Sequence, residues 1–553
     1  MKNYIGKIVL QGIIIIFLLL SIIVFLSLIL IDYDLIIDYI IWISSYPVEK
    51  HGTIITIITP WRLILLQVVS AGCVIFASLS LFFFNKLYSL IDKFIFYFSR
   101  SLKNIIRDVK TQNALVILII PFIGAIYFSF FIPVSYDESY TYLLFTDKPF
   151  YYCMMFYPYP NNHVLHSLLT NFTDTIPFLP ALICLRLPAL VSAFLAWIVG
   201  YSFVKRYYSE KVAMFVIGIS STLFMSIYYN FMARGYSLIL LFFIISLYAA
   251  FNIIKNGNRK KDWLFFSISS ILGFYVMPSF LYPYLILNVL ILIYNYRDIK
   301  LQVIFNLILC IGVVALYAPI IIVDGIDTLV SNQFVIPKSR IEVSELLFPF
   351  FRNVLQEIFS MPYYIVVLCI ITAFMIAWKN NNRRVLTLWV LFIVAPFLLL
   401  IAHSVIPFPR TFSYYAFIIL FLIGISFQKY IAKLPIFLLL IGIFVIQMAS
   451  NLNFINKIGP YETFNTWGKE INDFVLKEPN KIYYLGASYN TPNFEFELVT
   501  RGYNLGNITY DLNKNLSADT LMNYHYILID ADKDKTILRK PTFSNGSMNI
   551  YTE

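Results

Sequence analysis

The chain contains few charged residues: Asp, Glu, Lys and Arg make up only 13% of its 553 residues. A typical soluble domain carries roughly 25% charged and 45–50% apolar residues, whereas 60% of this sequence is hydrophobic. The shortage of charge excludes a soluble globular domain and indicates an integral membrane protein.

Cysteine is also scarce, and the five cysteines include no CxxC pair. The sequence therefore predicts neither a disulfide framework nor a cysteine metal site. A cleavable signal peptide is not indicated, because no small-residue cleavage site follows the first apolar run at Asp32-Tyr33-Asp34. We also find no internal repeat of the kind that marks secondary transporters.

Apolar runs of about 20 residues, long enough to cross a bilayer, recur along the chain. We predict an all-α polytopic membrane protein of about thirteen transmembrane helices with a small α/β C-terminal domain outside the cytoplasm. The predicted spans lie near residues 8–31, 60–84, 114–133, 184–204, 212–232, 236–254, 263–278, 280–296, 302–323, 361–378, 385–404, 412–428 and 434–450.

The net charge of +11 reflects basic residues on every second loop, which is the distribution that the positive-inside rule predicts. Nucleic acid is therefore not an expected partner, whereas membrane lipids are. The N-terminus is expected in the cytoplasm and the tail outside it. Three regions follow: 1–113 with two spans and a basic amphipathic segment, a core over 114–450 with external loops 134–183 and 324–360, and an external α/β domain over 451–553. In the last region, 482–485 and 526–529 are predicted strands and 461–476 a predicted helix.

The first external loop carries the most informative acids. Asp137 and Glu138 directly follow the span 114–133, and ionisable groups at a membrane boundary are candidates for function. Two adjacent carboxylates repel each other, so that one of them suits proton transfer. The alternative is a helix cap, because acids favour the start of a helix.

A cluster of polar residues follows in the same loop. Asn162 is a good helix cap, and His163 and His166 are spaced to share one helical face. A divalent metal held by Glu138 and His163 is one interpretation. Hydrogen-bonded structure without a metal is the other.

Two arginines lie where the positive-inside rule disfavours them, in predicted external segments: Arg234 and Arg410. An arginine kept there is expected to pair with an acid or a phosphate, or else to extend its head group to the water at a helix end. Lys338 and Arg340 lie in the longer external loop, where an amphipathic segment could cover a lipid headgroup.

Taken in order, these residues resemble the GT-C glycosyltransferases, in particular the protein O-mannosyltransferases and aminoarabinose lipid A transferases of the family 39 type. The resemblance covers about 114–450. It is carried by Asp137-Glu138, Asn162-His163-Val164-Leu165, Leu185-Arg186-Leu187-Pro188, Ala233-Arg234-Gly235-Tyr236-Ser237 and Pro407-Phe408-Pro409-Arg410.

The resemblance implies a donor sugar on a polyprenyl phosphate, an acceptor that is a lipid, a glycan or a protein, and a bacterial plasma membrane. Asp137 would act as the general base in an inverting transfer. Arg410, with Arg234 or with Lys338 and Arg340, would hold the departing phosphate. Glu138 would position the acceptor or bind a metal with His163, and Asn162, His166 and Tyr140 would contact the acceptor or the metal.

Two other classes remain open from the sequence. A polymerase or ligase of polyprenyl-linked glycans also has many spans, but such proteins rely on an arginine-rich large external loop. A transporter of lipid-linked sugars should carry ionisable residues near the middle of the bilayer, whereas the notable charges here lie at the predicted external surface.

Overall fold

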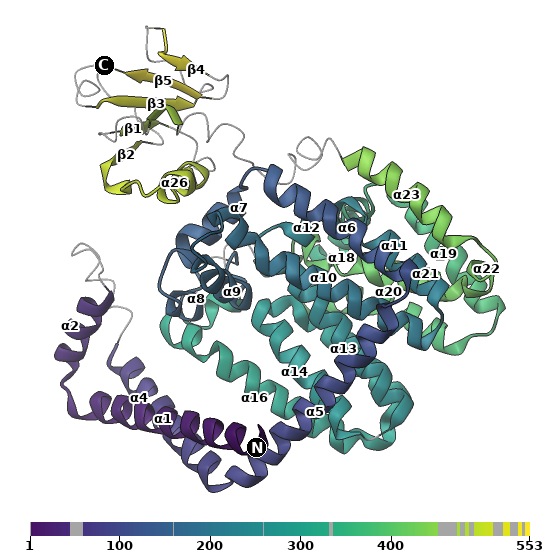
Figure 1. The fold of residues 1–553 in the computed structure, drawn as a ribbon, viewed down its shortest axis with the longest axis horizontal. Coiled ribbons are helices and arrows are strands. Elements are labelled where there is room, and N and C mark those ends of the chain that lie inside the picture. The colour runs from purple at the N-terminus through teal and green to yellow at the C-terminus, as the bar shows by residue number, and fades with distance from the viewer. Residues whose placement is uncertain are drawn as a thin grey trace.

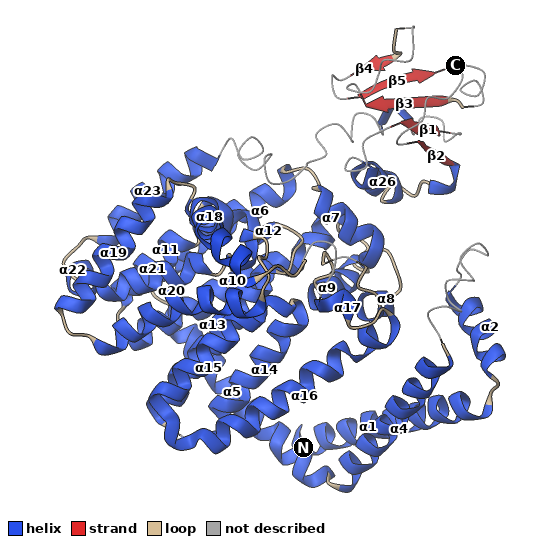
Figure 2. Ribbon diagram, turned by 180° about the vertical axis from the view of Figure 1, so that it is seen from behind, coloured by secondary structure: helices blue, strands red, loops and turns tan. Residues whose placement is uncertain are grey.

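The computed structural model describes residues 2–44, 59–158, 160–257, 259–330, 336–451, 473–475, 482–485, 491–511, 524–530, 540–544 and 548–552. Within these residues the chain is mainly helical, and a small β-sheet lies near its C-terminus (Figure 1). Figure 2 shows from behind that the strands lie together at one end of the molecule with α26 (Thr491–Val499) beside them, apart from the larger group of helices.

Two apolar N-terminal helices, α1 (Lys2–Leu30) and α4 (Pro60–Phe82), pack against each other to one side of the larger helical body (Figure 1), and α4 contacts that body at α16 (Ile299–Val323). The side-chain amide of Gln67 joins them by donating to the carbonyl of Leu28 at 2.7 Å. Helix α2 (Tyr33–Ser44) follows α1. Most large apolar side chains of this pair are exposed, which suits contact with lipid rather than water.

Helix α5 (Phe84–Val109) links this pair to the body, and it is amphipathic, as its alternating apolar and basic residues predict. Its apolar side packs on the start of α14, where the rings of Phe94 and Phe265 lie 5.5 Å apart. The ammonium group of Lys261 lies 5.0 Å from the ring of Tyr97. Basic side chains of α5, including Lys93 and Arg100, are exposed.

The remaining helices form the body. They are α6 (Gln112–Phe131), α7 (Tyr136–Thr141), the π-helix η2 (Tyr142–Thr146), α8 (Tyr151–Met155), α9 (Val164–Asp174), α10 (Ala181–Tyr207), α11 (Glu210–Ser220), α12 (Phe224–Phe231), α13 (Tyr236–Asn256), α14 (Lys260–Val276), η3 (Pro278–Phe280), α15 (Leu281–Asn295), η4 (Tyr296–Asp298), α16 (Ile299–Val323), α17 (Asp327–Val330), α18 (Arg340–Phe359), α19 (Tyr363–Lys379), α20 (Arg383–His403), η5 (Pro409–Phe412), α21 (Tyr415–Ser426), α22 (Gln428–Ile431) and α23 (Ile436–Asn451). Helices α10 and α13 lie at its centre, and Phe203, Phe243 and Trp263 are fully buried there.

Seven stretches of the described chain are long and apolar enough to cross a membrane, or up to nine if each of two bent helix pairs forms one span. The prediction of about thirteen spans is not confirmed. Helices α11 and α12 are bent by 76°, and α18 and α19 by 92°, and a run of apolar residues does not reveal such bends. Helix α14 has 17 residues and α21 has 12, fewer than the roughly 20 that span a bilayer.

The C-terminal sheet has the strand order β2-β1-β3-β5-β4. β1 pairs in parallel with β2 and β3, and β5 pairs antiparallel with β3 and β4. The strands are β1 (Ile482–Leu485), β2 (Ile508–Asp511), β3 (Tyr526–Asp530), β4 (Phe543–Ser544) and β5 (Met548–Thr552), with α26 (Thr491–Val499) and η6 (Leu505–Asn507) between β1 and β2.

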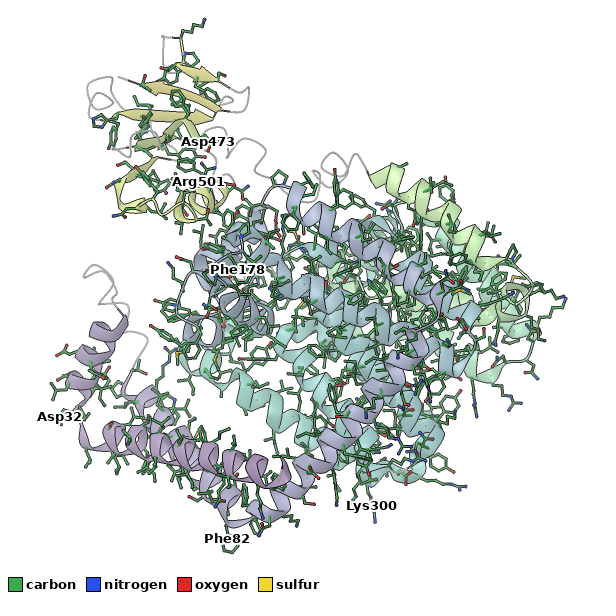
Figure 3. The ribbon with its side chains drawn as sticks, in the orientation of Figure 1. Asp32, Phe82, Phe178, Lys300, Asp473 and Arg501 are labelled. Carbon is green, nitrogen blue, oxygen red and sulfur yellow. The ribbon has the colours of Figure 1, made fainter. Side chains whose placement is uncertain are left out.

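The predicted strands at 482–485 and 526–529 are confirmed as β1 and β3. The predicted helix over 461–476 lies outside the described residues except for 473–475, which are helical. Asp473 pairs with Arg501 at 2.5 Å, and Figure 3 shows both in the C-terminal domain beside the sheet.

Close helix packing at Gly424 gives a test of the body. A Cβ atom at Gly424 would lie 2.9 Å from Cγ2 of Val216, on the facing helix α11. We expect Gly424→Ala to lower the free energy of unfolding by about 1–3 kcal/mol, the usual cost of overpacking. Thermal unfolding in detergent measures the loss. Gly72→Ala is the matched control, because no atom lies within 4 Å of its added Cβ, and an equal loss there would contradict this packing.

Candidate active site

The acidic pair lies at the start of the short helix α7, which begins with a capping box. Ser135 is the N-cap; its hydroxyl accepts from the backbone N–H of Glu138, and the carboxylate of Glu138 accepts from the backbone N–H of Ser135. The sequence Ser135-Tyr136-Asp137-Glu138 is therefore an S-x-x-E capping signature. This reciprocal cap fixes α7 directly after α6.

Glu138 also forms a buried ion pair with Arg186 of α10, and neither side chain is exposed. Nε of Arg186 donates to Oε1 of Glu138 at 2.8 Å, and Nη2 donates to Oε2 at 2.6 Å. The other N–H groups of Arg186 donate to the carbonyls of Ser129, Ile132 and Pro133 at 2.8–2.9 Å. All five guanidinium donors are thus satisfied, and they cover the C-terminal end of α6.

The carboxylate of Glu138 is saturated in the same way. Oε1 accepts a second hydrogen bond from the N–H of Ala233 at 2.9 Å, and Oε2 accepts one from the N–H of Ser135 at 3.1 Å. Its four lone-pair sites are therefore occupied. A carboxylate held in this way has no position left for a metal ion or an acceptor.

Asp137, the neighbouring acid, instead faces two arginines. Its Oδ2 lies 2.6 Å from Nη1 of Arg234 and 3.6 Å from Nη2 of Arg410. The side chain of Asp137 is 16% exposed, that of Arg234 5% and that of Arg410 26%. The looser and more exposed pair is the one with Arg410, which comes from the distant segment η5.

The loop after Tyr157 holds Arg234 from the other side. The side-chain oxygen of Asn161 accepts from Nη1 of Arg234, and its amide donates to the backbone carbonyl of Asp137 at 3.1 Å. Gly235 donates its N–H to Nδ1 of His163 at 2.7 Å. A Cβ at Gly235 would lie 2.6 Å from that nitrogen, so the close approach requires glycine at this position.

Both histidines are buried. Burial and the nearby guanidinium of Arg234 lower the pKa of His163 well below its usual value, and they lower the pKa of His166 to about 3. Both rings are therefore neutral near pH 7. Because Nδ1 of His163 accepts a hydrogen bond, Nε2 carries the ring proton and is a donor.

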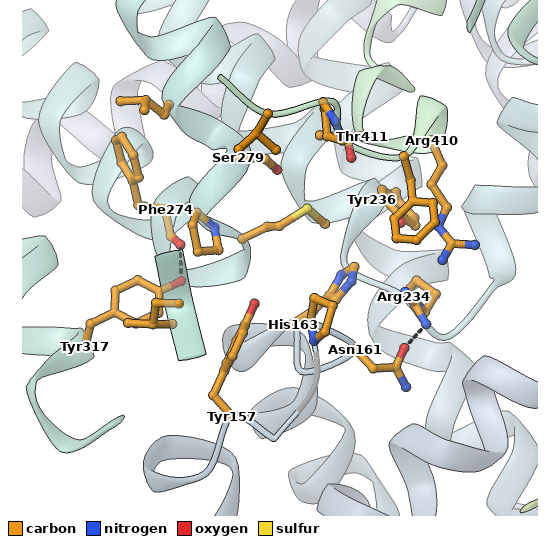
Figure 4. A pocket seen from close by; sticks show the side chains of 18 of the residues that line it. Tyr157, Asn161, His163, Arg234, Tyr236, Phe274, Ser279, Tyr317, Arg410 and Thr411 are labelled. Atoms are coloured by element: carbon orange, nitrogen blue, oxygen red, sulfur yellow. Dashed lines mark hydrogen bonds between the residues drawn. The ribbon is translucent and has the colours of Figure 1, made fainter. Parts of the chain in front are cut away.

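A cavity of about 720 Å³ opens beside Asp137, Arg234 and Arg410. Figure 4 shows the charged and polar side chains gathered on one side of it and Tyr317 and Phe274 on the other. Most of the far side is apolar and comes from the helical stretch 274–329. The cavity is thus mainly apolar with ionic groups on one side, the usual character of a small-molecule or lipid site.

A second cavity of about 180 Å³ shares Asp137, Arg234 and Arg410 with the first. It also contains Tyr229 and Glu357, which lies in the last turn of α18. An acid at the C-terminal end of a helix is opposed by the helix dipole, so the position of Glu357 is costly without a cation. The guanidinium of Arg410 lines the same cavity. Asp137, Arg234 and Arg410, which line both cavities, therefore lie between them.

No protein-family model matches the sequence, and none of the curated proteins matches it significantly. One carboxylate between two guanidinium groups, facing two cavities, can accept a proton from one ligand while cations hold an anionic group of another.

The structure brings some of the predicted site residues together and separates others. The first cavity is lined by Asp137, Tyr140, His163, Arg234 and Arg410. It does not include Glu138, Asn162, His166, Lys338 or Arg340. Lys338 and Arg340 are exposed near the start of α18. Of the four predicted phosphate-binding cations, only Arg234 and Arg410 contact Asp137.

Two of the predicted roles do not fit this geometry. Asn162 does not cap α9; its amide donates to the carbonyls of Cys153 and Phe156, and its oxygen accepts from Ser167, so it braces the loop. The metal site of Glu138 and His163 does not fit either, because the oxygens of Glu138 and Nδ1 of His163 already accept hydrogen bonds. Among the described residues, no group of three or more His, Cys, Asp or Glu side chains is placed to hold a metal.

Sequence reasoning assigned no role to three residues near the site: Arg186, Asn161 and Glu357. The capping signature at Ser135 was a readable sign that Glu138 is structural. Arg186 was also visible as a charge inside an apolar run, where an arginine needs a partner. Glu357 gave no such signal, since α18 contains several charged residues.

The buried pair of Glu138 and Arg186 generates a stability prediction. Arg186→Met leaves a buried carboxylate without its cation, and we expect the free energy of unfolding to fall by about 3–5 kcal/mol. Adding Glu138→Gln to Arg186→Met should recover part of the loss, because the stranded charge is removed. Denaturant unfolding in detergent measures both variants.

The exposed pair of Lys148 and Asp147, at 3.2 Å, is the control for that measurement. Lys148→Met should cost no more than about 1 kcal/mol. If Arg186→Met cost as little as Lys148→Met, the pair would not be holding α6, α7 and α10 together.

Proposed function

We propose that this protein is a membrane glycosyltransferase that moves a sugar from a polyprenyl-phosphate donor to an acceptor hydroxyl or amine. One observation carries the proposal: Asp137 pairs with Arg234 and Arg410 at the end of a large apolar cavity. This arrangement offers a proton acceptor, cations for a phosphate and an apolar space for a lipid tail in one place. It agrees with the roles that the resemblance to GT-C enzymes implies for the same three residues.

In the proposed reaction, the acceptor O–H or N–H gives its proton to the carboxylate of Asp137. The acceptor atom forms a bond to the anomeric carbon while the bond from that carbon to the phosphate oxygen breaks, which inverts the centre. The electron pair of the broken bond leaves with the polyprenyl phosphate. The guanidinium groups of Arg410 and Arg234 stabilise the charge that grows on the phosphate.

The two arginines are expected to divide this work. Arg234 is nearly buried, is paired at 2.6 Å and is held by Asn161, so it keeps the carboxylate in position. Arg410 is the more exposed and more distant partner, and it can turn from the carboxylate to the phosphate at the smallest cost. The two cavities on either side of Asp137 then suit donor and acceptor, with the lipid tail in the larger, more apolar one.

We also propose the arrangement of the spans and their orientation in the membrane. The core over 114–450 is of the GT-C type, and several helices shorter than a full bilayer complete a set of about thirteen spans. The N-terminus lies in the cytoplasm of a bacterial cell, and the reaction takes place at the outer face of the plasma membrane. The C-terminal sheet domain lies on that same outer side, together with α7 and the loop that follows it.

The two alternatives predict other behaviour. A transporter of lipid-linked sugars would move its ligand without breaking the bond between sugar and phosphate. A polymerase or ligase of polyprenyl-linked glycans would rely on an arginine-rich large external loop. We favour the monophosphate-linked transferase because two arginines and one carboxylate match a single phosphate and one proton transfer.

Replacing the proposed base is the first functional test. We expect Asp137→Asn to lower the rate of sugar transfer from polyprenyl-phosphate sugars by about 10²–10⁴-fold, since an amide cannot accept the proton. Binding of decaprenyl phosphate, followed by native mass spectrometry, should be retained. Asp147→Asn removes an exposed carboxylate of the same kind and should leave transfer unchanged. Full transfer by Asp137→Asn would exclude this residue as the base.

The four predicted cations can be separated by affinity. A hydrogen bond to a charged group contributes about 1.5–3 kcal/mol, so we expect Arg410→Gln to weaken binding of decaprenyl phosphate by about 10- to 150-fold. Lys338→Gln and Arg340→Gln should bind as the natural protein does, because neither side chain lines the cavity. Equal losses in all three variants would place the phosphate elsewhere.

A further inference from the structure

The C-terminal domain contacts the helical body through α26, and α26 packs on α7, the helix that carries Asp137. Figure 1 shows α26 on the side of the domain that faces α7. The contact is specific as well as apolar. The hydroxyl of Ser139, two residues after Asp137, donates to the side-chain oxygen of Asn493 at 2.7 Å, and both residues are fully buried.

Helix α26 has two buried sides. Phe494 and Leu498, four residues apart, face the domain's own sheet, where the ring of Phe494 stacks 5.1 Å from that of Tyr484. Asn493 and Phe496, three residues apart, face the helical body. A helix needs only one apolar side to pack on a sheet, so the second buried side belongs to the contact with α7.

The side of α26 that faces the helical body packs against residues next to those of the two ion pairs. The ring of Phe496 is 3% exposed and meets that of Tyr142 edge-on at 5.0 Å. It also packs in a cluster whose other buried members are Val134, Leu185 and Ala233. Each of these directly precedes a residue of the site: Ser135 of the capping box, Arg186 of the buried pair and Arg234.

We propose that α26 positions the catalytic acid: Asn493 and Phe496 hold α7 so that Asp137 lies between the two arginines. The inference rests on the proposed function only in taking Asp137 as the base. Helix α7 is six residues long, too short to be stable alone, so its orientation depends on what packs against it. The C-terminal domain then supports the site from behind α7, and both residues act through Ser139 and Tyr142 rather than on a substrate.

Hydrogen exchange of the full chain in lipid nanodiscs tests this without any substrate. We expect Asn493→Ala and Phe496→Leu to speed exchange of the backbone amides of residues 139–142 by about tenfold or more, because local opening governs their protection. Ser139→Ala should speed exchange at least as much as Asn493→Ala, because the Ser139 hydroxyl also lies 3.0 Å from the carbonyl of Ser135. Adding Asn493→Ala to Ser139→Ala should add little, since the hydrogen bond between the two side chains is already removed. Glu497→Gln is the control: its carboxylate pairs with Arg501 at 3.6 Å within the domain, and exchange in α7 should not change.

Transfer kinetics give the second measurement. Asn493→Ala should lower kcat by about tenfold with little change in KM for the donor, because a small displacement of a catalytic group is costly. Unchanged exchange in α7 and unchanged kcat in both Asn493→Ala and Ser139→Ala would overturn the inference. If instead Asp137→Asn retained full transfer, the proposed base would be wrong, and the exchange data would still decide whether α26 holds α7.

Discussion

The carboxylate of Glu138 and the guanidinium of Arg186 form the contact on which the rest of the site depends. Five N–H groups and four lone-pair sites are all used, and the bonds join the end of α6, the start of α7, the N-terminal part of α10 and the backbone at Ala233. Charges buried in an apolar body are stable only when paired and hydrogen-bonded in this way. Because the network is complete, it fixes three segments that are far apart in the sequence.

The adjacent residues then carry the chemistry. Asp137 lies in the same turn of α7 as Glu138, and Arg234 directly follows Ala233. The structural ion pair of Glu138 with Arg186 therefore sets the geometry of the proposed functional pair of Asp137 with Arg234. Arg410 reaches Asp137 from a separate segment, and α26 packs on α7. Of the two neighbouring acids, the fully hydrogen-bonded Glu138 is thus structural, and Asp137, which faces the cavities, is the proposed base.

Several of these features could be predicted from the sequence because they depend on local signals. The shortage of charge indicated a membrane protein, and short apolar runs bounded by turn residues predicted strands β1 and β3. The unusual positions of Arg234 and Arg410 marked them as partners of an acid or a phosphate. The capping signature at Ser135 marks Glu138 as structural, but its partner Arg186 lies 48 residues away and could not be identified from a local pattern. Long-range contacts of this kind also decided the bends between helices and the position of Glu357, which no periodic pattern reveals.

The most direct test of the account is a structure of the protein in nanodiscs with decaprenyl phosphate, determined by electron cryomicroscopy. The account predicts density for the phosphate within hydrogen-bonding distance of Arg410 and Arg234, with the lipid tail along Val313 and Tyr317 in the larger cavity. A phosphate bound away from both arginines, or a tail outside this cavity, would contradict the proposed function.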